Sequence, residues 1–299
     1  MSKRKSKFYL RRFTKGDFFI YSILIIASFL CVIPVWNVIC ISFSRAADVE
    51  AGRVAFWPVH FTKAAYHNLI EDRTFFHAFG LSLVRVVLGT SMSMVLMFLM
   101  SYPLSMETEE FPARTFYMWF IIITMLFSGG LIPTYIVVTK LGMRNTIWAL
   151  TVPGAVSTYN TILMVNYFRN LPKELRESAA IDGASPMRTL LQIYIPVSIP
   201  TIATLTLFCA LWHWNDYFHG MIYMQKQENY PLMTFIRSLT FKTDELSGLP
   251  VEEIKRRSEM GSTTFNAAKV TIAMIPVLCV YPFVQKYFVK GIMLGSVKG

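Results

Sequence analysis

One run of residues within an apolar segment combines side chains that could bind a polar small molecule. It reads Trp212-His213-Trp214-Asn215-Asp216. Aromatic rings present an apolar face on which a sugar ring can stack, and amide or carboxylate groups hydrogen-bond hydroxyls. Trp212, Trp214, Asn215 and Asp216 are therefore candidate ligand contacts, as is Asn160 in another apolar segment. Two alternatives stay open, namely an aromatic belt at a membrane interface or polar groups that hold helices together.

A second informative stretch covers residues 169–196. It begins with a polar segment that lies between two apolar runs, and its pattern predicts a bent pair of short helices. Pro172 suits the first turn of a helix. Gly183 stands where a helix ends in a left-handed residue. Ser185 followed by Pro186 is the pattern of an N-cap and a new first turn. The sequence therefore predicts two short helices joined by a glycine bend.

The chain lacks the motifs of an enzyme or a metal protein. It has no G-x-x-x-x-G-K-[ST] phosphate loop, whose backbone amides and lysine would hold a nucleotide. No Ser/His/Asp set or carboxylate pair suggests a catalytic residue. The four cysteines lie in apolar segments without a C-x-x-C pair, which argues against metal ligands and disulfides. We therefore expect no cofactor on this chain.

The composition indicates that the chain is folded in lipid. Hydrophobic residues make up 54% of the 299 residues and charged residues only 16%, against about 25% in soluble domains. The net charge is +11, and seven Lys/Arg fall within the first sixteen residues, directly before an apolar run. Such a basic segment stays in the cytoplasm. A basic surface for nucleic acid would need a soluble domain, and the sequence offers none, so nucleic acid is not an expected partner.

Six apolar runs are long enough to cross a bilayer as helices, which takes roughly 20 residues each. The fold class is therefore an all-α membrane protein with six transmembrane helices and both termini in the cytoplasm. Residues 1–17 form a basic cytoplasmic N-terminus and residues 18–299 one membrane domain. Arg85 is expected to snorkel to the membrane interface. The predicted spans are residues 18–43, 78–106, 116–138, 146–168, 195–224 and 265–288.

This topology assigns the polar segments to the two sides of the membrane. The two-helix loop at residues 169–190 lies in the cytoplasm, between the fourth and fifth spans. Residues 44–77 and 225–264 lie outside. Within the last segment, residues 250–260 predict a short helix. That helix is either a contact for an extracellular binding protein or a solvated surface element.

The cytoplasmic loop resembles the coupling loop of permeases from ABC-type importers. That family carries E-A-A, three residues, G, nine residues and I-x-L-P. Here Glu177 to Gly183 read E-S-A-A-I-D-G, and nine residues later comes I-Y-I-P, so the departures are Ser178 for Ala and Ile195 for Leu. The string LPKELRESAAIDGAS is similar to the carbohydrate-uptake subclass. Residues 127–150 resemble oligosaccharide permeases of Gram-positive bacteria, and residues 285–299 resemble the tail of the maltose-type permease subunit that lacks extra N-terminal helices.

The resemblance implies a function and a set of partners. It describes a permease subunit of an ATP-driven sugar importer in the bacterial cell membrane. The implied partners are a second permease subunit, two ATPase subunits and an extracellular solute-binding lipoprotein. The tail from Gly295 to Gly299 is implied to be a second ATPase contact. The residues to which the resemblance gives the ATPase-docking role are Glu177, Ala179, Ala180, Asp182 and Gly183.

Two other functions stay open at the level of the residues. An ion-coupled secondary transporter needs intramembrane carboxylates or ion sites in broken helices, usually within repeats. Of the residues in the spans only Asp216 qualifies, and no internal repeat is visible. A membrane assembly protein without transport activity is the other alternative, and capture of an ATPase would distinguish it from an importer subunit.

Overall fold

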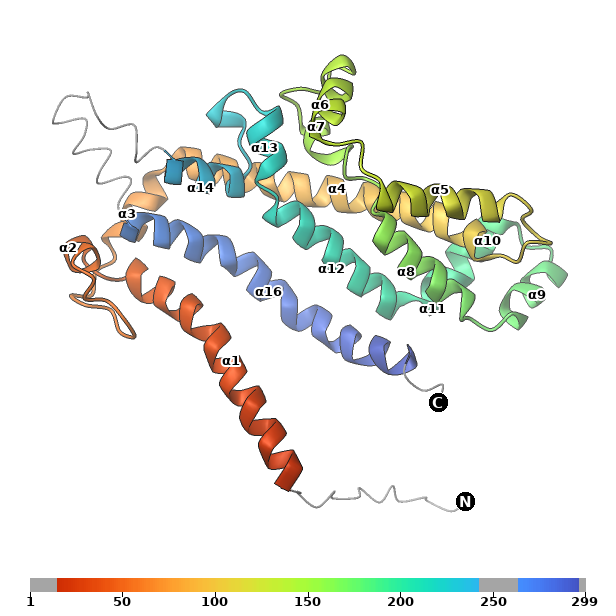
Figure 1. The fold of residues 1–299 in the computed structure, drawn as a ribbon, viewed down its shortest axis with the longest axis horizontal. Helices are drawn as coiled ribbons and strands as arrows, with labels where there is room; N and C mark the ends of the chain where they lie inside the picture. Colours follow the sequence, from red (N-terminus) through yellow and green to blue (C-terminus); the bar gives the residue numbers. More distant parts are fainter. Residues whose placement is uncertain (1–14, 242–262, 296–299) are drawn as a thin grey trace. The chain divides into compact units, whose positions relative to one another are not determined.

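The computed structural model describes residues 15–241 and 263–295, which are helical and contain no β-strand in those ranges (Figure 1). The all-α prediction is therefore confirmed for this part of the chain. A π-helical turn spans Leu190–Tyr194 and a 3-10 turn spans Gln227–Asn229. The α-helices are α1 (Lys15–Ser42), α2 (Ala46–Glu50), α3 (Ala64–Glu71), α4 (Arg73–Ser105), α5 (Arg114–Leu126), α6 (Leu131–Lys140), α7 (Ile147–Thr151), α8 (Thr158–Arg169), α9 (Glu174–Ile181), α10 (Pro186–Thr189), α11 (Ile195–Val197), α12 (Ile199–Asn215), α13 (Phe218–Tyr223), α14 (Leu232–Phe241) and α16 (Thr263–Gly295).

The chain divides into two parts, residues 1–68 with 258–271 and residues 69–257 with 272–299. In the first part, the segment after α1 folds back onto the end of that helix. The indole N–H of Trp36 donates to the carbonyl oxygen of Phe56 at 2.8 Å. The side-chain amide of Asn37 donates to the carbonyl oxygen of the preceding residue, Ala55, at 2.7 Å. The most apolar stretch of α1 is not buried in the protein, as expected for a helix that faces lipid or another subunit.

In the second part, α8 and α12 both pack along the long helix α4, which is the central helix of this part (Figure 1). Small residues allow this close approach. At Gly89 of α4, an added Cβ would lie 2.3 Å from the ring of His213 on α12, so no larger residue fits at this crossing. Methionine, aromatic, leucine and cysteine side chains form one core cluster: Met94, Met97, Tyr102, Met164, Phe168, Leu190, Tyr194, Leu205 and Cys209.

Three helices in the described ranges are long and apolar enough to cross a membrane, and up to five spans result if each bent pair counts as one. α1, α4 and α16 coincide with the first, second and sixth predicted spans. One bent pair is α5 with α6, which meet at 113°, and the other joins residues 186–197 to α12 at 88°. Between α5 and α6, Gly130 adopts a φ of +86°, a value that glycine reaches at no steric cost.

The predicted fourth span, residues 146–168, is not one helix. α7 ends at Thr151 and α8 begins at Thr158, with Pro153 and Gly154 between them. α8 has 12 residues. At 1.5 Å per residue that is about 18 Å, well short of a hydrocarbon core of about 30 Å. The expectation of a continuous helix here is wrong, because proline removes a backbone donor and glycine favours a break.

Candidate coupling loop and substrate pocket

The first helix of the coupling loop ends in the glycine bend that the sequence predicts. The amide of Gly183 donates to the carbonyl oxygen of Ala180 at 3.1 Å, and the amide of Ala184 donates to that of Ala179 at 2.9 Å. Gly183 has a φ of +70°. These two bonds form a Schellman motif, which requires a left-handed residue at the bend. The predicted helix end is thus confirmed, although the helix starts at Glu174 rather than at the proline before it.

The second half of the loop fastens it to the helices of the membrane domain. α10 begins as predicted, with the Ser185 side chain as N-cap and Pro186 in the first turn. The π-helical turn follows, and there Tyr194 packs edge-on against Tyr102 and Phe168, with ring centroids 5.1 Å apart in both pairs. Because Tyr102 belongs to α4 and Phe168 to α8, the loop is rooted in two helices at once.

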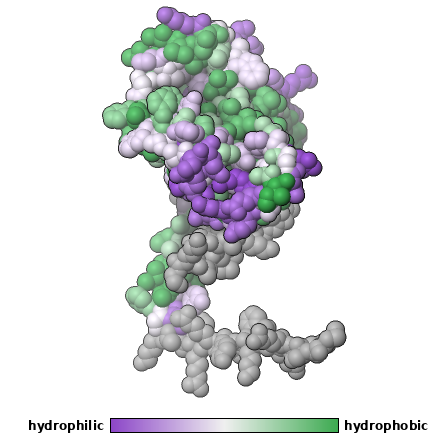
Figure 2. Space-filling model, turned by 90° about the vertical axis from the view of Figure 1, so that its right-hand side faces the viewer, coloured by the Kyte–Doolittle hydropathy of each residue, from purple (hydrophilic) through white to green (hydrophobic). Residues whose placement is uncertain are grey.

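The coupling loop presents a defined outer face. Ala179 is only 3% exposed, so its side chain packs inside this chain and is not available to a partner. Ile181, by contrast, is 87% exposed, which is unusual for a large apolar side chain. Figure 2 faces the end of the molecule that carries α9 and α10 and shows a largely hydrophilic surface there. The exposed docking candidates of the loop are Glu177, Ala180, Ile181, Asp182 and Gly183.

Two ion pairs join α9 to the turn between α4 and α5. Lys173 Nζ lies 2.9 Å from a carboxylate oxygen of Glu107, and a guanidinium nitrogen of Arg176 lies 2.9 Å from one of Glu110. The hydrogen bond from Lys173 lowers the pKa of the Glu107 carboxyl, and the same bond raises the pKa of Lys173. The Lys173–Glu107 pair is therefore charged at neutral pH.

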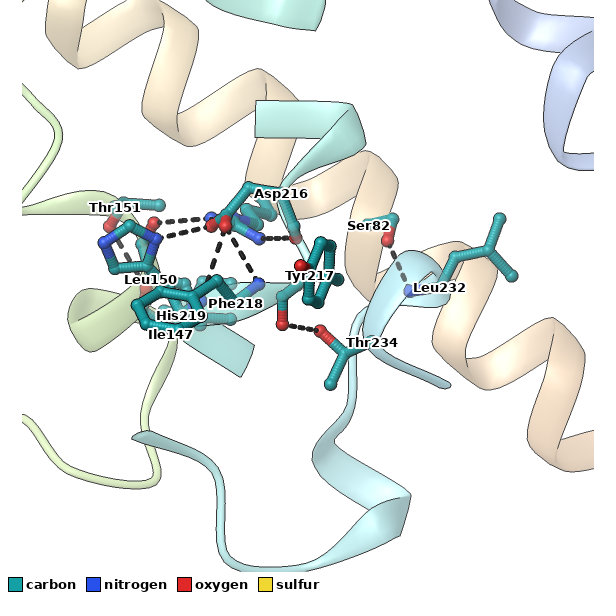
Figure 3. A network of polar contacts seen from close by, with 11 residues as sticks. Ser82, Ile147, Leu150, Thr151, Asp216, Tyr217, Phe218, His219, Leu232 and Thr234 are labelled. Carbon is teal, nitrogen blue, oxygen red and sulfur yellow. Dashed lines mark hydrogen bonds and ion pairs between the residues drawn. The ribbon is translucent and has the colours of Figure 1, made fainter. Parts of the chain in front are cut away.

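A buried polar network holds the break between α12 and α13. The guanidinium of Arg85 on α4 is fully buried and forms an ion pair with the Asp216 carboxylate. It also donates to the carbonyl oxygens of Asp216, at 2.8 Å, and Leu150, at 3.3 Å. The Asp216 carboxylate accepts the backbone amide of Phe218 at 3.0 Å and lies 2.7 Å from Nδ1 of His219 (Figure 3).

This network corrects the prediction for Arg85. Arg85 does not snorkel to the interface, because a buried carboxylate and two carbonyls accept its guanidinium inside the protein. The Asp216 carboxylate, in turn, is engaged by Arg85 and by the start of α13. Next to it, Thr234 Oγ1 donates to the carbonyl oxygen of Tyr217 at 2.9 Å, fastening α14 to this junction (Figure 3).

A pocket of about 470 Å³ opens between α8, α12 and the break that precedes α8. Trp212 and Asn160, both predicted as ligand contacts, line it. An added Cβ at Gly154 would come within 2.3 Å of the Trp212 ring, so the glycine leaves room for the indole. The remaining lining residues are Ser93, Val156, Ser157, Thr158, Tyr159, Phe208, Cys209 and His213.

Trp214, Asn215 and Asp216, the other three predicted ligand contacts, do not line this pocket. Trp214 is 5% exposed and packs edge-on against Phe79, with ring centroids 5.7 Å apart. Asn215 is exposed, but it is not among the lining residues. Successive helical residues are about 100° apart, so Trp212 and Trp214 point to opposite sides of α12. The cluster that the sequence suggested is therefore split between a pocket wall and a core.

Residues 10–293 match the family described as the binding-protein-dependent transport system inner membrane component. The chain belongs to this family. It is 36% identical over 283 residues to the polygalacturonan/rhamnogalacturonan transport system permease protein YtcP of Bacillus subtilis (strain 168), covering 95% of this chain and 98% of that one. It is 38% identical over 272 residues to Protein LplC of the same organism, covering 90% of each.

A solved structure has the same fold. It is the crystal structure of a bacterial ABC transporter involved in the import of the acidic polysaccharide alginate. The TM-score is 0.81 at 29% identity, with 93% of this chain and 99% of that chain covered. The protein is therefore an inner-membrane permease component of an ABC importer. The family consists of membrane permease components, and it implies a partner ATPase and a solute-binding protein.

Several residues of the permease are placed in ways that sequence reasoning missed. Ile181 carried a signal, because it is a large apolar residue between small and charged neighbours in a polar loop. In the sequence, Glu107 and Glu110 are recognisable only as part of an acidic turn, and nothing there indicates that they pair with residues of the coupling loop. Nothing in the local sequence pairs Arg85 with a residue 131 positions away. Gly295 ends α16, whereas Gly299 and the predicted helix at residues 250–260 lie outside the described residues.

Proposed function

We propose that this permease takes up oligosaccharides built from acidic sugars, as one of two permease subunits in an importer driven by separate ATPases. The observation that carries the substrate class is the agreement of two similar proteins. One relative is named for polygalacturonan and rhamnogalacturonan transport, and the solved structure belongs to a transporter of the acidic polysaccharide alginate. Both matches cover more than nine-tenths of this chain.

The proposed topology is six membrane crossings with both termini in the cytoplasm. α1, α4 and α16 give three, and the two bent pairs give two more. The sixth would be the broken segment α7–α8, whose interruption by Pro153 and Gly154 lies at the wall of the pocket. Non-helical backbone at membrane depth is tolerated where it is buried in protein or lines a cavity. The basic N-terminus supports this orientation, which puts α9 in the cytoplasm.

ATP would be bound and hydrolysed by two partner subunits, because the 299 residues contain no phosphate loop. The outer face of α9 and its glycine bend would insert into one of them. Its residues are Glu177, Ala180, Ile181, Asp182 and Gly183, and the tail from Gly295 to Gly299 would make a second contact. A second permease subunit would complete the membrane pathway, and an extracellular solute-binding lipoprotein would deliver the sugar.

The pocket beside α12 would form part of the sugar pathway. Trp212, Tyr159 and Phe208 offer aromatic faces for a sugar ring. Asn160, Ser157 and Thr158 offer polar groups that can exchange hydrogen bonds with hydroxyls. Of the ligand contacts predicted from the sequence, we keep Trp212 and Asn160 in this proposal. We do not include Trp214, Asn215 and Asp216.

The test is the ATPase activity of the complete complex in proteoliposomes, with its binding protein present and candidate sugars added. Digalacturonic acid is expected to stimulate hydrolysis and to be imported, whereas maltose and glycerol 3-phosphate are not. Import should persist when a protonophore collapses the proton gradient and should stop when ATP is depleted. Stimulation by maltose alone would contradict the substrate class, and import that follows the proton gradient would contradict the mechanism.

A further inference from the structure

The turn between α4 and α5, residues 106–113, is acidic and firmly attached to the membrane helices on either side. Its sequence contains three glutamates. Arg114 Nε, at its end, donates to the carbonyl oxygen of Leu104 at 3.0 Å and so caps α4. Phe111 packs against the cluster of Leu104, Ile121 and Val165, which belong to α4, α5 and α8. The acidic turn is thus fixed to three helices before it meets the coupling loop.

On its other side the acidic turn holds the coupling helix α9. Glu110 uses one oxygen, Oε2, both to accept the backbone amide of Glu107 at 3.2 Å and to pair with Arg176. The Arg176 side chain is 18% exposed, so this pair is the more enclosed of the two. Lys173 and Glu107 form the second pair one turn earlier along α9. The two ion pairs therefore contact the same side of the coupling helix.

The orientation of α9 follows from these contacts. Arg176 and the buried Ala179 are three positions apart, so they lie on the same face of the helix, which is turned toward the membrane domain. Glu177, Ala180 and Ile181 are exposed and are left for the ATPase. Exposed ion pairs of this kind contribute little to folding stability. The two pairs instead fix the orientation of α9 against the membrane domain. They also link α9 to α4, a helix that the coupling loop does not join covalently.

We propose that the acidic turn is a second attachment of the coupling helix, through which movement of the ATPase reaches α4 directly. Glu110 and Arg176 are its positioning residues. The covalent route from α9 leads to α8 on one side and to α12 on the other. Beside the contact of Tyr194 with Tyr102, the acidic turn gives α9 itself a link to α4, which carries Ser93 in the pocket wall and Arg85 in the buried network. This inference rests on the proposed ATPase coupling.

The test measures the accessibility of one position on α4 and needs no sugar substrate. Ser93→Cys is introduced on α4 after the four native cysteines are replaced by Ala or Ser, and a hydrophilic maleimide reports its accessibility in the assembled complex. Labelling is compared with and without ATP plus vanadate, which traps the ATPases. Four versions of the complex are used: unaltered turn, Glu110→Arg, Arg176→Glu, and the exchange of both charges. Capture of the ATPase by each version shows that the complex has assembled.

In the unaltered complex, the extent of maleimide labelling at Ser93→Cys should change when the ATPases are trapped. Each single charge reversal should reduce that change about two- to fivefold. The double exchange should restore it, because the pair is re-formed with reversed charges. Glu109→Arg is the matched control, since Glu109 makes no ion pair within the described residues of the chain, and it should leave the change intact.

Three results would overturn the inference: no trapping-dependent change at position 93 in the unaltered complex, full changes in both single reversals, or a double exchange no better than the singles. Failure of digalacturonic acid to stimulate the ATPases would contradict the proposed substrate and would leave this labelling readout intact. The two proposals therefore fail separately.

Discussion

Arg85 and Asp216 lie 131 positions apart and form a buried ion pair across the junction of α12 and α13. The pair ties the end of α12 to the middle of the central helix α4. Asp216 also starts α13 by accepting the amide of Phe218. One carboxylate thus stabilises the place where α12 ends and α13 begins.

Replacement of Arg85 by Leu should destabilise the permease by about 3–5 kcal/mol, since it leaves a buried carboxylate without its counter-charge. The measurement is the thermal unfolding of the purified complex in detergent. The double variant with Asp216→Leu removes both charges and should lose less than the single variant. An Arg85→Leu protein as stable as the original would show that the pair is not what holds this junction.

Gly183→Leu should leave the protein inserted in the membrane but weaken capture of the ATPase. A β-carbon costs about 1–2 kcal/mol in the left-handed conformation, so the bend of the coupling loop would be populated about 5- to 30-fold less. Asn tolerates this conformation, which makes Gly183→Asn the matched control with a smaller loss. Pull-down of the ATPase by the tagged permease measures both. Equal capture by the Leu variant would contradict the role of the bend.

Gly154→Val should impair import through the pocket. Its Cβ would fall 2.3 Å from the Trp212 ring, so the indole would have to leave its present place in the pocket wall. We expect a clear fall in sugar-stimulated ATP hydrolysis with the complex still assembled. Gly80→Ala is the control, because no atom lies within 4 Å of the added carbon there. If Trp212→Ala and Gly154→Val both transport normally, the pocket is not on the sugar pathway.

Ile181→Asp should reduce binding of the ATPase without changing stability. The side chain is 87% exposed, and surface substitutions of this kind usually change stability by less than about 0.5 kcal/mol. Loss of binding would therefore report a lost contact rather than a damaged fold. Ile181→Val keeps the apolar contact and should bind nearly normally. Matching losses in the unfolding temperature and in binding would instead indicate a structural role.

The coupling loop could be predicted from the sequence because its structure is locally encoded. Gly183, Ser185 and Pro186 each favour one backbone conformation at one position, and the helix end and the new helix start follow from neighbours within a few residues. Ala179 shows the limit of this reasoning. The family resemblance implied a docking contact for this residue, but whether it faces the partner or the core depends on how α9 is seated on the acidic turn.

The polar residues of the membrane domain could not be paired from the sequence, because their partners are set by tertiary packing. Arg85 has no charged neighbour on α4 that would reveal its partner across the domain. The tryptophans at positions 212 and 214 looked like one cluster, but their spacing puts them on opposite sides of a helix. The six apolar runs were recognisable by length and composition, whereas the break at Pro153 and Gly154 shows that an apolar run need not be one helix.

Chemical accessibility of position 181 tests the central claim most directly. A single Ile181→Cys, in a protein without other cysteines, is treated with a membrane-impermeant thiol reagent in right-side-out and inside-out vesicles, and with a cross-linker in the assembled complex. We predict labelling only in inside-out vesicles and a cross-link to the ATPase subunit. Labelling from the outer side, or an assembled complex in which position 181 never cross-links to the ATPase, would contradict the assignment of α9 as the coupling helix.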